Sequence, residues 1–324
     1  MIEKSGKLNM KLMHSYFRTA LASALNTSSW TRKSLVRSSD SAYRVSSIAA
    51  KSKNGNYNEQ RISHRLDGLD KPTVWEEFTP LALEHKAVNL GQGFPDWEPP
   101  KFVMDAMHQS ISLGGVKSNQ YARSAAHMPL AVVLAEDYTK KFNIDRPIDP
   151  VTEIATAVGC TQAFYCAMQG LLNPLDEVLL MEPAFDIYSA QVRMAGGVPK
   201  FIPLRQQPVE TLSNANDVFH LDMDELKSSI TPQTKVLVIN TPHNPTGKMF
   251  SKNELEQIAA IVELNPQLTV IADEVYEYIV FDKNKSPHVH FASLPGMYER
   301  TLTLSSSGKT FSCTGWKVGW AVGM

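Results

Sequence analysis

Two periodicities of hydrophobic positions alternate along the chain from about residue 61 onwards. Short runs rich in Val, Ile and Leu predict buried strands, and apolar residues at every third or fourth position between them predict amphipathic helices. The predicted strands are 153–158, 177–182, 198–204, 235–240, 268–274, 301–306 and 317–323. The predicted helices are 76–86, 101–113, 128–142, 159–172, 185–196, 222–230 and 252–264. The stretch "AVNLGQGFPDWEPP", residues 87–100, predicts one more short strand that runs into a loop rich in Gly and Pro.

This alternation predicts an α/β fold with a mainly parallel sheet that is covered by helices on both faces. Sheets of this kind bind ligands beyond the carboxyl ends of their strands. We therefore expect the chemistry of the protein to lie in the stretches that follow the predicted strands. These are "VGCTQ" (158–162), "MEPAFD" (181–186), "INTPHNPTG" (239–247), "ADEVY" (272–276) and "SSSGK" (305–309).

The first 55 residues have a different composition and are left out of the fold. Lys and Arg recur in them, Ser and Thr are abundant, and Glu3 and Asp40 are the only acidic residues. The stretch "MHSYFRTALASAL", residues 13–25, is able to form a basic amphipathic helix. Such a segment is typical of a mitochondrial presequence, and this favours a mitochondrial location. The alternative is an ordinary disordered tail on a cytoplasmic protein.

Overall composition excludes several classes of partner. Lys and Arg total 32 and Asp and Glu total 33, so the charge does not indicate binding to nucleic acid or to an acidic membrane. No apolar run is long enough to predict a transmembrane helix. Three cysteines do not form a disulfide framework and favour a reducing compartment. The "HVH" of residues 288–290 could place two imidazoles on one face of a strand, but no Cys or HExxH pattern accompanies it, so no metal site is predicted.

Lys309 lies in "SSSGKTFSCTGWKVGW", residues 305–320, where "GKT" follows a predicted strand in the way that a phosphate-binding P-loop ends. A Walker A loop needs Gly five residues before Gly308, and that position is Thr303. The dinucleotide fingerprint also fails, because "GQGFPD" has Asp96 at its third Gly position. Lys309 is therefore either a covalent catalyst or an ordinary surface lysine. The residues at the ends of the other predicted strands indicate which of these two roles it has.

The strand ends together offer groups that suit pyridoxal phosphate. Lys309 supplies an amine that can form a Schiff base. Asp273, at the end of a buried strand, can hold a pyridinium nitrogen protonated. Tyr276 and Asn244 can donate hydrogen bonds to the ring oxygen, and Phe185 can stack on the ring. The helix that starts near residue 159, together with Ser306 and Lys317, can hold the phosphate.

At this point the chain resembles the fold type I, pyridoxal phosphate-dependent aminotransferases of class I/II. It is most similar to the branch of the kynurenine–oxoglutarate transaminases and cysteine-S-conjugate β-lyases. The motifs that carry this resemblance run in order from about residue 61 to the end of the chain. They are "RLDGLDKPTVWEEF", "VNLGQGFPDW", "NQY", "NTPHNPTGK", "DEVYEY", "SLPGMYERTLT" and "SSSGKTFSCTGWKVGW".

The resemblance implies a role for each matching residue. Lys309 is implied to be the Schiff-base lysine that moves a proton between the amino-acid Cα and the cofactor. The implied cofactor-binding residues are Gly159, Cys160, Thr161, Phe185, Asn244, Asp273, Tyr276, Ser306, Lys309 and Lys317. Trp75 and Gly93 are implied to line the substrate pocket, and Tyr121 to reach across the interface of a homodimer. The implied reaction transfers an amino group from an L-amino acid, such as kynurenine, another aromatic amino acid, Gln or a sulfur amino acid, to a 2-oxo acid such as 2-oxoglutarate. Some β-elimination from cysteine S-conjugates is implied as well.

The chain also departs from the family. "ARSAAHMPL", residues 122–130, has Ala where the family has Gly, and "GCTQAF" differs from the start of the corresponding helix in that branch. Family members continue well beyond this length, into the small domain and the arginine that binds the substrate carboxylate. We therefore expect a leader at 1–55, an N-terminal arm and small-domain segment at 56–105, and a large cofactor domain at 106–324 without a C-terminal small domain. The alternative to an enzyme is a truncated, non-catalytic chain that acts as a binding or interaction protein.

Overall fold

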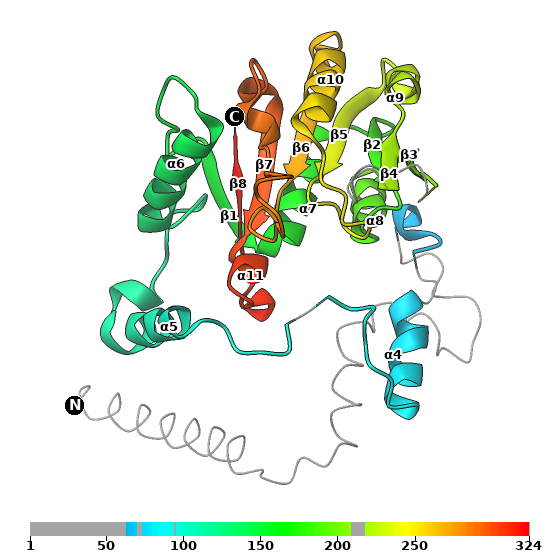
Figure 1. Cartoon of the computed structure of the whole chain (residues 1–324). Helices are drawn as coiled ribbons and strands as arrows, with labels where there is room; N and C mark the ends of the chain where they lie inside the picture. Colours follow the sequence, from blue (N-terminus) through cyan, green and yellow to red (C-terminus); the bar gives the residue numbers. More distant parts are fainter. Residues whose placement is uncertain (1–62, 70–72, 94, 209–217, 324) are drawn as a thin grey trace, which may run out of the picture. The chain divides into compact units, whose positions relative to one another are not determined.

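A computed structural model describes residues 63–69, 73–93, 95–208 and 218–323 (Figure 1). The chain divides into two compact units between Asp70 and Lys71, and each is described by itself. Within the described residues the first unit contributes one 3-10 helix, η3 (His64–Leu66). The presequence predicted at 1–55 lies outside the described residues. The predicted domain limits at 56–105 and 106–324 stay predictions.

The second unit contains an eight-stranded sheet in the order β1-β8-β7-β6-β5-β2-β3-β4. Strands β2, β3, β5, β6 and β7 run parallel, whereas β8 lies antiparallel between β1 and β7, and β4 lies antiparallel to β3. This arrangement confirms the predicted mainly parallel, mixed sheet. The strands are β1 (Ile154–Val158), β2 (Glu177–Glu182), β3 (Val198–Gln206), β4 (Phe219–Leu221), β5 (Thr234–Asn240), β6 (Thr269–Asp273), β7 (Thr301–Ser306) and β8 (Val318–Val322).

Helices of this unit precede and alternate with the strands. They are α4 (Val74–Glu84), α5 (Lys101–Leu113), α6 (Met128–Phe142), α7 (Gly159–Leu171), α8 (Ile187–Met194), α9 (Met223–Ser229), α10 (Lys252–Glu263) and the single turn α11 (Ser307–Thr310). Short 3-10 helices are η4 (Lys117–Asn119), η7 (Phe291–Ser293), η8 (Tyr298–Arg300) and η9 (Thr314–Trp316). None of the described helices is long and apolar enough to cross a membrane.

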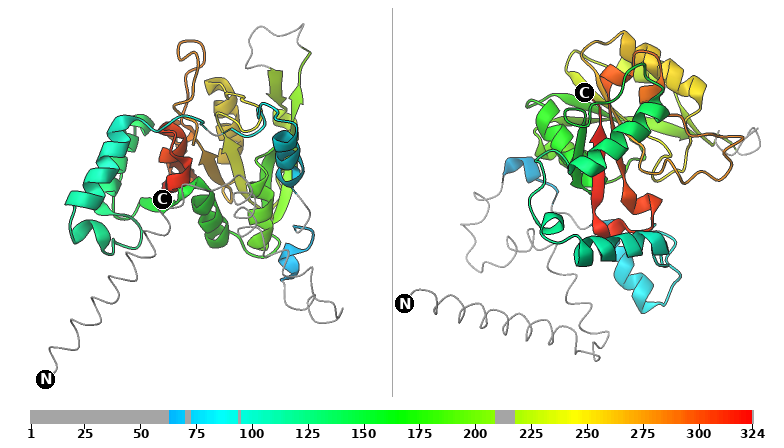
Figure 2. Two further views of the ribbon diagram at one scale, coloured as in Figure 1. Left: turned by 90° about the horizontal axis from the view of Figure 1, so that it is seen from below. Right: turned by 90° about the vertical axis from the view of Figure 1, so that its left-hand side faces the viewer.

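Successive residues of a strand point to opposite faces of the sheet, and helices bury both of these faces. In β5, Leu237 packs with α9 and α10 on one face, and Val238 packs with α7 and α8 on the other. A third cluster joins α6 to the antiparallel end of the sheet through Ile154 and Trp320. Helices α9 and α10 therefore cover one face of the strands, and α7 and α8 cover the other (Figures 1 and 2).

Local sequence explains why α10 forms where it does. Ser251 and Glu254 make a reciprocal capping box that satisfies free N–H groups at the start of the helix. Leu255, Ile258 and Val262 follow at helical spacing and are fully buried against the sheet. Burial of such a stripe accounts for most of the stability of a surface helix.

Most predicted elements are present with small shifts, and α5 and α6 have the predicted limits. The short strand predicted at the start of residues 87–100 is wrong, since residues 87–90 form no strand. Val88 is 83% exposed and Leu90 is 90% exposed, so this apolar run has no neighbouring strand to supply hydrogen bonds. The three-residue strand β4 was missed because it is too short to show an alternation.

Candidate active site

A pocket of about 660 Å³ lies at the carboxyl edge of the parallel strands. Every strand end that the sequence singled out contributes to its wall. The lining includes Gly159, Cys160, Thr161, Phe185, Asn244, Asp273, Tyr276, Ser306, Lys309 and Lys317. Trp75, Gly91, Gln92 and Gly93 close the pocket from the N-terminal segment of the same unit. The volume falls in the range of small-molecule sites.

The N-terminus of α7 forms one wall of this pocket. Gly159 has a φ of +78°, a conformation that favours glycine. Its backbone packs directly on β8, where a Cβ added to Gly319 would lie 2.4 Å from the carbonyl carbon of Gly159. The first N–H groups of a helix have no partner within the helix, so this end can bind an anion. Ser306 and Lys317 add a hydroxyl and a cation to the same wall.

Asp273 is the buried carboxylate of the pocket and is 5% exposed. Tyr188 donates a hydrogen bond to Oδ2, and the Cys160 thiol donates to Oδ1 over 3.4 Å. Burial raises the pKa of Asp273, whereas these two donors and the N–H of Val275 lower it by favouring the ionised form. The carboxylate is thus held from α7 and α8 in the wall of the pocket, where it can pair with a cationic group.

Lys309 extends into the pocket from α11. Its Nζ donates to the carbonyl oxygen of Gly93 over 3.2 Å and lies 5.6 Å from the centre of the Tyr276 ring. Burial, and then the charge of Lys317, lower the pKa of Lys309. A lowered pKa increases the fraction of neutral amine, which is the nucleophilic form. Lys309 therefore differs from an ordinary surface lysine.

Tyr276, Asn244 and Phe185 are the remaining residues that were predicted to contact a cofactor ring. Burial, and then the charge of Asp273, raise the pKa of Tyr276 to about 12, so its hydroxyl is a proton donor at neutral pH. Phe185 meets Tyr188 edge to face, with 5.5 Å between the ring centroids. All three residues line the pocket with Asp273.

Two residues of the site escaped the sequence prediction. Tyr188 lies inside α8 and not at a strand end, so the search for strand ends passed over it. Asn240 is the last residue of β5, and its side chain joins two strand ends. Its Nδ2 donates to the carbonyl oxygen of Asp273 over 2.9 Å, and its Oδ1 accepts from the N–H of Asn244 over 2.6 Å. Its position before "TPHNPTG" was a signal that could have found it.

Two of the three predicted substrate residues line the pocket and the third does not. Trp75 and Gly93 line the pocket. Tyr121 does not line it and is fully exposed. Its predicted role across a dimer interface stays a prediction, since one chain contains no such interface.

The residues present fit pyridoxal phosphate. A buried carboxylate, an amine of lowered pKa, a helix N-terminus beside a lysine, and an aromatic face all border one pocket. These are the groups that a pyridinium nitrogen, an aldehyde, a phosphate and an aromatic ring each require.

Comparisons with known proteins point the same way. Residues 85–324 match the family described as aminotransferase class I and II. Kynurenine–oxoglutarate transaminase of Dictyostelium discoideum is 46% identical over 258 residues, which cover 78% of this chain and 58% of that protein. Kynurenine–oxoglutarate transaminase 1 of Homo sapiens is 43% identical over 267 residues, which cover 82% of this chain and 61% of that protein. The chain thus spans about 60% of the length of these curated relatives.

Solved structures agree with the sequence relatives. N-succinyldiaminopimelate aminotransferase from Mycobacterium tuberculosis superimposes with a TM-score of 0.72 at 43% identity, covering 81% of this chain and 64% of that one. An aromatic aminotransferase from Pyrococcus horikoshii superimposes with a TM-score of 0.64 at 36% identity, covering 72% of this chain and 58% of that one. The family and these structural neighbours are pyridoxal phosphate-dependent enzymes.

Proposed function

Because the chain belongs to the class I and II aminotransferase family, we propose that it binds pyridoxal phosphate and transfers an amino group from an L-amino acid to a 2-oxo acid. The observation that carries this proposal is the pocket that brings Lys309 and Asp273 together at one edge of the sheet. Pyridoxal phosphate supplies an electron-accepting ring that stabilises negative charge at the amino-acid Cα.

Lys309 has two tasks in this proposal. Its neutral amine would hold the cofactor through the aldehyde, and as a free amine the same group would accept the proton that leaves the substrate Cα. Burial and the charge of Lys317 lower the pKa of Lys309, which brings the amine closer to the pH at which a general base works well. The carbonyl oxygen of Gly93 orients Nζ within the pocket.

Asp273, Tyr276 and the α7 start hold the cofactor in register with Lys309. Asp273 would pair with the ring nitrogen and favour its protonated form. The orientation of this carboxylate is fixed by Tyr188 and Cys160. The Tyr276 hydroxyl and the Asn244 amide donate hydrogen bonds to the ring oxygen. The first N–H groups of α7, with Ser306 and Lys317, bind the phosphate.

For the substrate we propose an aromatic L-amino acid such as kynurenine, with 2-oxoglutarate as a preferred acceptor. The names of the curated relatives support this choice, as does the indole of Trp75 in the pocket wall. A β-lyase activity on cysteine S-conjugates is the second candidate chemistry of the same site. Release of pyruvate without a 2-oxo acid separates the lyase from the transaminase.

Two further proposals concern the setting of the enzyme. We propose a homodimer in which Tyr121 contacts the second copy, because this aromatic side chain is fully exposed. We also propose import into mitochondria through residues 1–55, on the basis of their basic, acid-poor composition. A fluorescent protein fused behind these residues should enter mitochondria, and a uniform cytoplasmic signal would contradict the import.

Absorption spectroscopy of the purified chain tests the function. Added pyridoxal phosphate should give a protein-bound absorption band, L-kynurenine should change that band, and 2-oxoglutarate should restore it. Lys309→Ala should abolish the band, while Lys227→Ala, at an exposed lysine of α9, should retain it. A band that forms but does not respond to any amino acid would indicate a binding protein. Absence of the band from the folded chain would contradict the cofactor site itself.

A further inference from the structure

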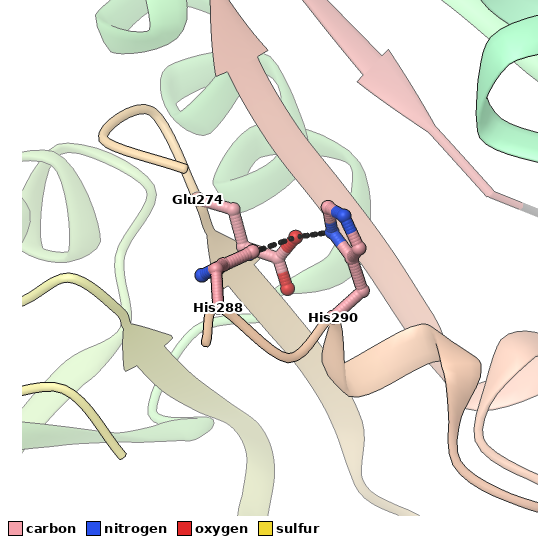
Figure 3. Close-up of side chains that lie close together, drawn as sticks. All are labelled: Glu274, His288 and His290. Atoms are coloured by element: carbon pink, nitrogen blue, oxygen red, sulfur yellow. Dashed lines mark hydrogen bonds and ion pairs between the residues drawn. The ribbon is translucent and has the colours of Figure 1, made fainter. Parts of the chain in front are cut away.

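A cluster of residues that could bind a metal ion lies just beyond the end of β6, the strand that carries Asp273. Glu274 follows β6, and His288 and His290 belong to the segment that leads into η7 (Figure 3). One ligand atom from each of these residues lies within 4.8 Å of the others. We refer to them as the Glu274–His288–His290 cluster. None of its members lines the pocket described above.

Both imidazoles face the same oxygen atom of Glu274. His288 Nε2 lies 3.4 Å from Oε2, and His290 Nδ1 makes a short contact with the same atom. The other carboxylate oxygen, Oε1, accepts a hydrogen bond from the N–H of Phe291 over 3.0 Å. Two nitrogen lone pairs and one carboxylate oxygen are thus able to converge on one point, with the carboxylate orientation fixed by the backbone.

The cluster is buried, so the charge of Glu274 needs a cation beside it. The side chain of Glu274 is fully buried, and those of His288 and His290 are 8% and 12% exposed. The nearby ammonium of Lys141 pairs with Asp137 and Glu277 and not with Glu274. Among the described residues, the two imidazoles are therefore the side chains that can supply this carboxylate with a positive charge, unless an ion does so.

The surroundings of His290 match those of a metal ligand. Its second ring nitrogen, Nε2, lies 3.6 Å from a carboxylate oxygen of Glu277. Histidines that bind metals usually direct the other ring nitrogen at a carboxylate or carbonyl, which fixes the ring and raises its basicity. Tyr138 donates to the opposite oxygen of Glu277 over 3.3 Å and so holds that carboxylate in turn. The second ring nitrogen of His288, Nδ1, is buried and has no hydrogen-bond partner among the described residues, so His288 lacks the support that Glu277 gives to His290.

We propose that the Glu274–His288–His290 cluster binds one Zn²⁺ ion, with a water molecule as the fourth ligand. Two imidazoles and one carboxylate suit Zn²⁺, whereas Ca²⁺ and Mg²⁺ prefer oxygen ligands alone. Tetrahedral bonds of about 2.0–2.1 Å place ligand atoms roughly 3.3 Å apart, which fits the His288 pair. The His290 pair must open to admit the ion. The site would join the segment before η7 to the end of β6, one residue from Asp273.

Metal titration of the full chain tests the proposal. The protein is freed of metal with a chelator and titrated with Zn²⁺ in competition with a chromogenic chelator, without pyridoxal phosphate or an amino acid. One equivalent should bind. Glu274→Gln, His288→Asn and His290→Asn should each weaken binding at least about tenfold. His220→Asn, at an exposed histidine of β4, is the matched control and should bind as the parent does.

Co²⁺ as a spectroscopic probe separates this site from the cysteines. The Co²⁺ complex should show the ligand-field bands of a tetrahedral nitrogen and oxygen site without thiolate absorption, and His288→Asn should abolish them. His288→Asn is the decisive variant because its folding can be checked by circular dichroism and it leaves the Glu274–His290 pair in place. No stoichiometric binding, or binding unchanged in a folded His288→Asn chain, would show that the cluster is only an ion-pair network. This outcome does not depend on the proposed transaminase activity.

Discussion

Helices α5 and α10 have similar lengths and similar amphipathic patterns, but only α10 has buried side chains. α10 buries Leu255, Ile258, Ala259, Ile261 and Val262 against the sheet. α5, like α4, has no buried residue, and Phe102 and Leu113 are 64% and 81% exposed. The apolar stripe therefore predicts that a helix forms but does not determine what covers it. In α10 the cover is the sheet, whereas α4 and α5 expose apolar surface of the kind that favours association.

The residues that line the pocket come from two regions that differ in the same way: the well-packed sheet and the sparsely packed segment that includes α4. Asp273 is the last residue of β6, and Lys309 and the α7 start directly follow strands of the same sheet. Trp75 and Gly93 lie on the segment that includes α4. The chemistry that requires fixed distances is thus placed on rigid elements. The wall that would contact a substrate is placed on the less packed segment. The predictions below test this division, from the largest expected effect to the smallest.

Paired leucine substitutions test the difference in packing directly. Leu255→Ala in α10 removes a fully buried side chain and should lower the free energy of unfolding by about 2–5 kcal/mol. Leu83→Ala in α4 removes one that is 69% exposed and should change it by less than about 0.5 kcal/mol. Urea unfolding followed by circular dichroism measures both. Equal effects would contradict the contrast between the two regions.

Cofactor affinity should depend on the sheet and not on the N-terminal segment. Asp273→Asn removes the charge that pairs with the ring nitrogen and should weaken pyridoxal phosphate binding by roughly ten- to a hundredfold, which corresponds to the loss of a charged hydrogen bond. Trp75→Ala should leave cofactor binding within about twofold, because we propose that this side chain contacts the substrate and not the cofactor. Fluorescence titration gives both dissociation constants. A larger loss in Trp75→Ala would reverse the assignment of the two walls.

Alanine substitutions at two glycines test the close backbone packing at the start of α7. Gly319→Ala would place its Cβ 2.6 Å from the backbone nitrogen of Cys160, so we expect a loss of about 1–3 kcal/mol in stability and weaker phosphate binding. Gly170→Ala, inside α7, meets no atom within 4 Å and should stabilise the chain by up to about 1 kcal/mol. Thermal unfolding with and without inorganic phosphate distinguishes the two. If Gly319→Ala unfolded at the same temperature as the parent chain and were stabilised by phosphate to the same extent, this would contradict the close contact between Gly319 and the α7 start.

Ion pairs of the two regions should respond differently to pH. The Arg146 guanidinium, opposed by burial, lowers the pKa of Glu153 from 4.5 to about 2, with help from the N–H of Asp149 and the Tyr298 hydroxyl. A depressed pKa contributes stability above pH 4.5 that is lost as the pH falls toward 2. Glu153→Gln should flatten this part of the profile of urea midpoint against pH.

The matched pair for this test is Lys101–Asp105 in α5. Its side chains are 84% and 49% exposed, so Asp105→Asn should leave the profile unchanged within about 0.5 kcal/mol. If Asp105→Asn flattened the profile as much as Glu153→Gln does, the two regions would not differ in the way that their burial indicates.

Sequence reasoning named most of the polar residues that line the pocket because these residues lie at strand ends. Asp273, Asn244 and Lys309 each follow a run of Val, Ile or Leu, and a parallel sheet brings such ends to one edge. Tyr188 could not be found this way, since its role depends on the hydrogen bond from its hydroxyl in α8 to Asp273, 85 residues further along the chain. The strand expected within residues 87–100 failed because a strand needs a neighbour, and pattern alone does not supply one.

The Glu274–His288–His290 cluster shows the same limit. The "HVH" motif was visible in the sequence, but without a partner it did not predict a metal site. Glu274 lies fourteen residues before His288 and meets it only because the segment after β6 returns to the end of that strand. Contacts of this kind arise from tertiary folding and not from local spacing.

The measurement that tests the central claim most directly is chemical trapping of the cofactor. The full chain is loaded with pyridoxal phosphate and reduced with borohydride, which fixes the cofactor on the lysine that binds it. Peptide mass spectrometry then identifies that lysine. We predict a single pyridoxyl group on Lys309, in the peptide that contains "SSSGK". Labelling of Lys317, or labelling spread over the exposed lysines, would contradict the assignment of Lys309 as the covalent cofactor-binding residue.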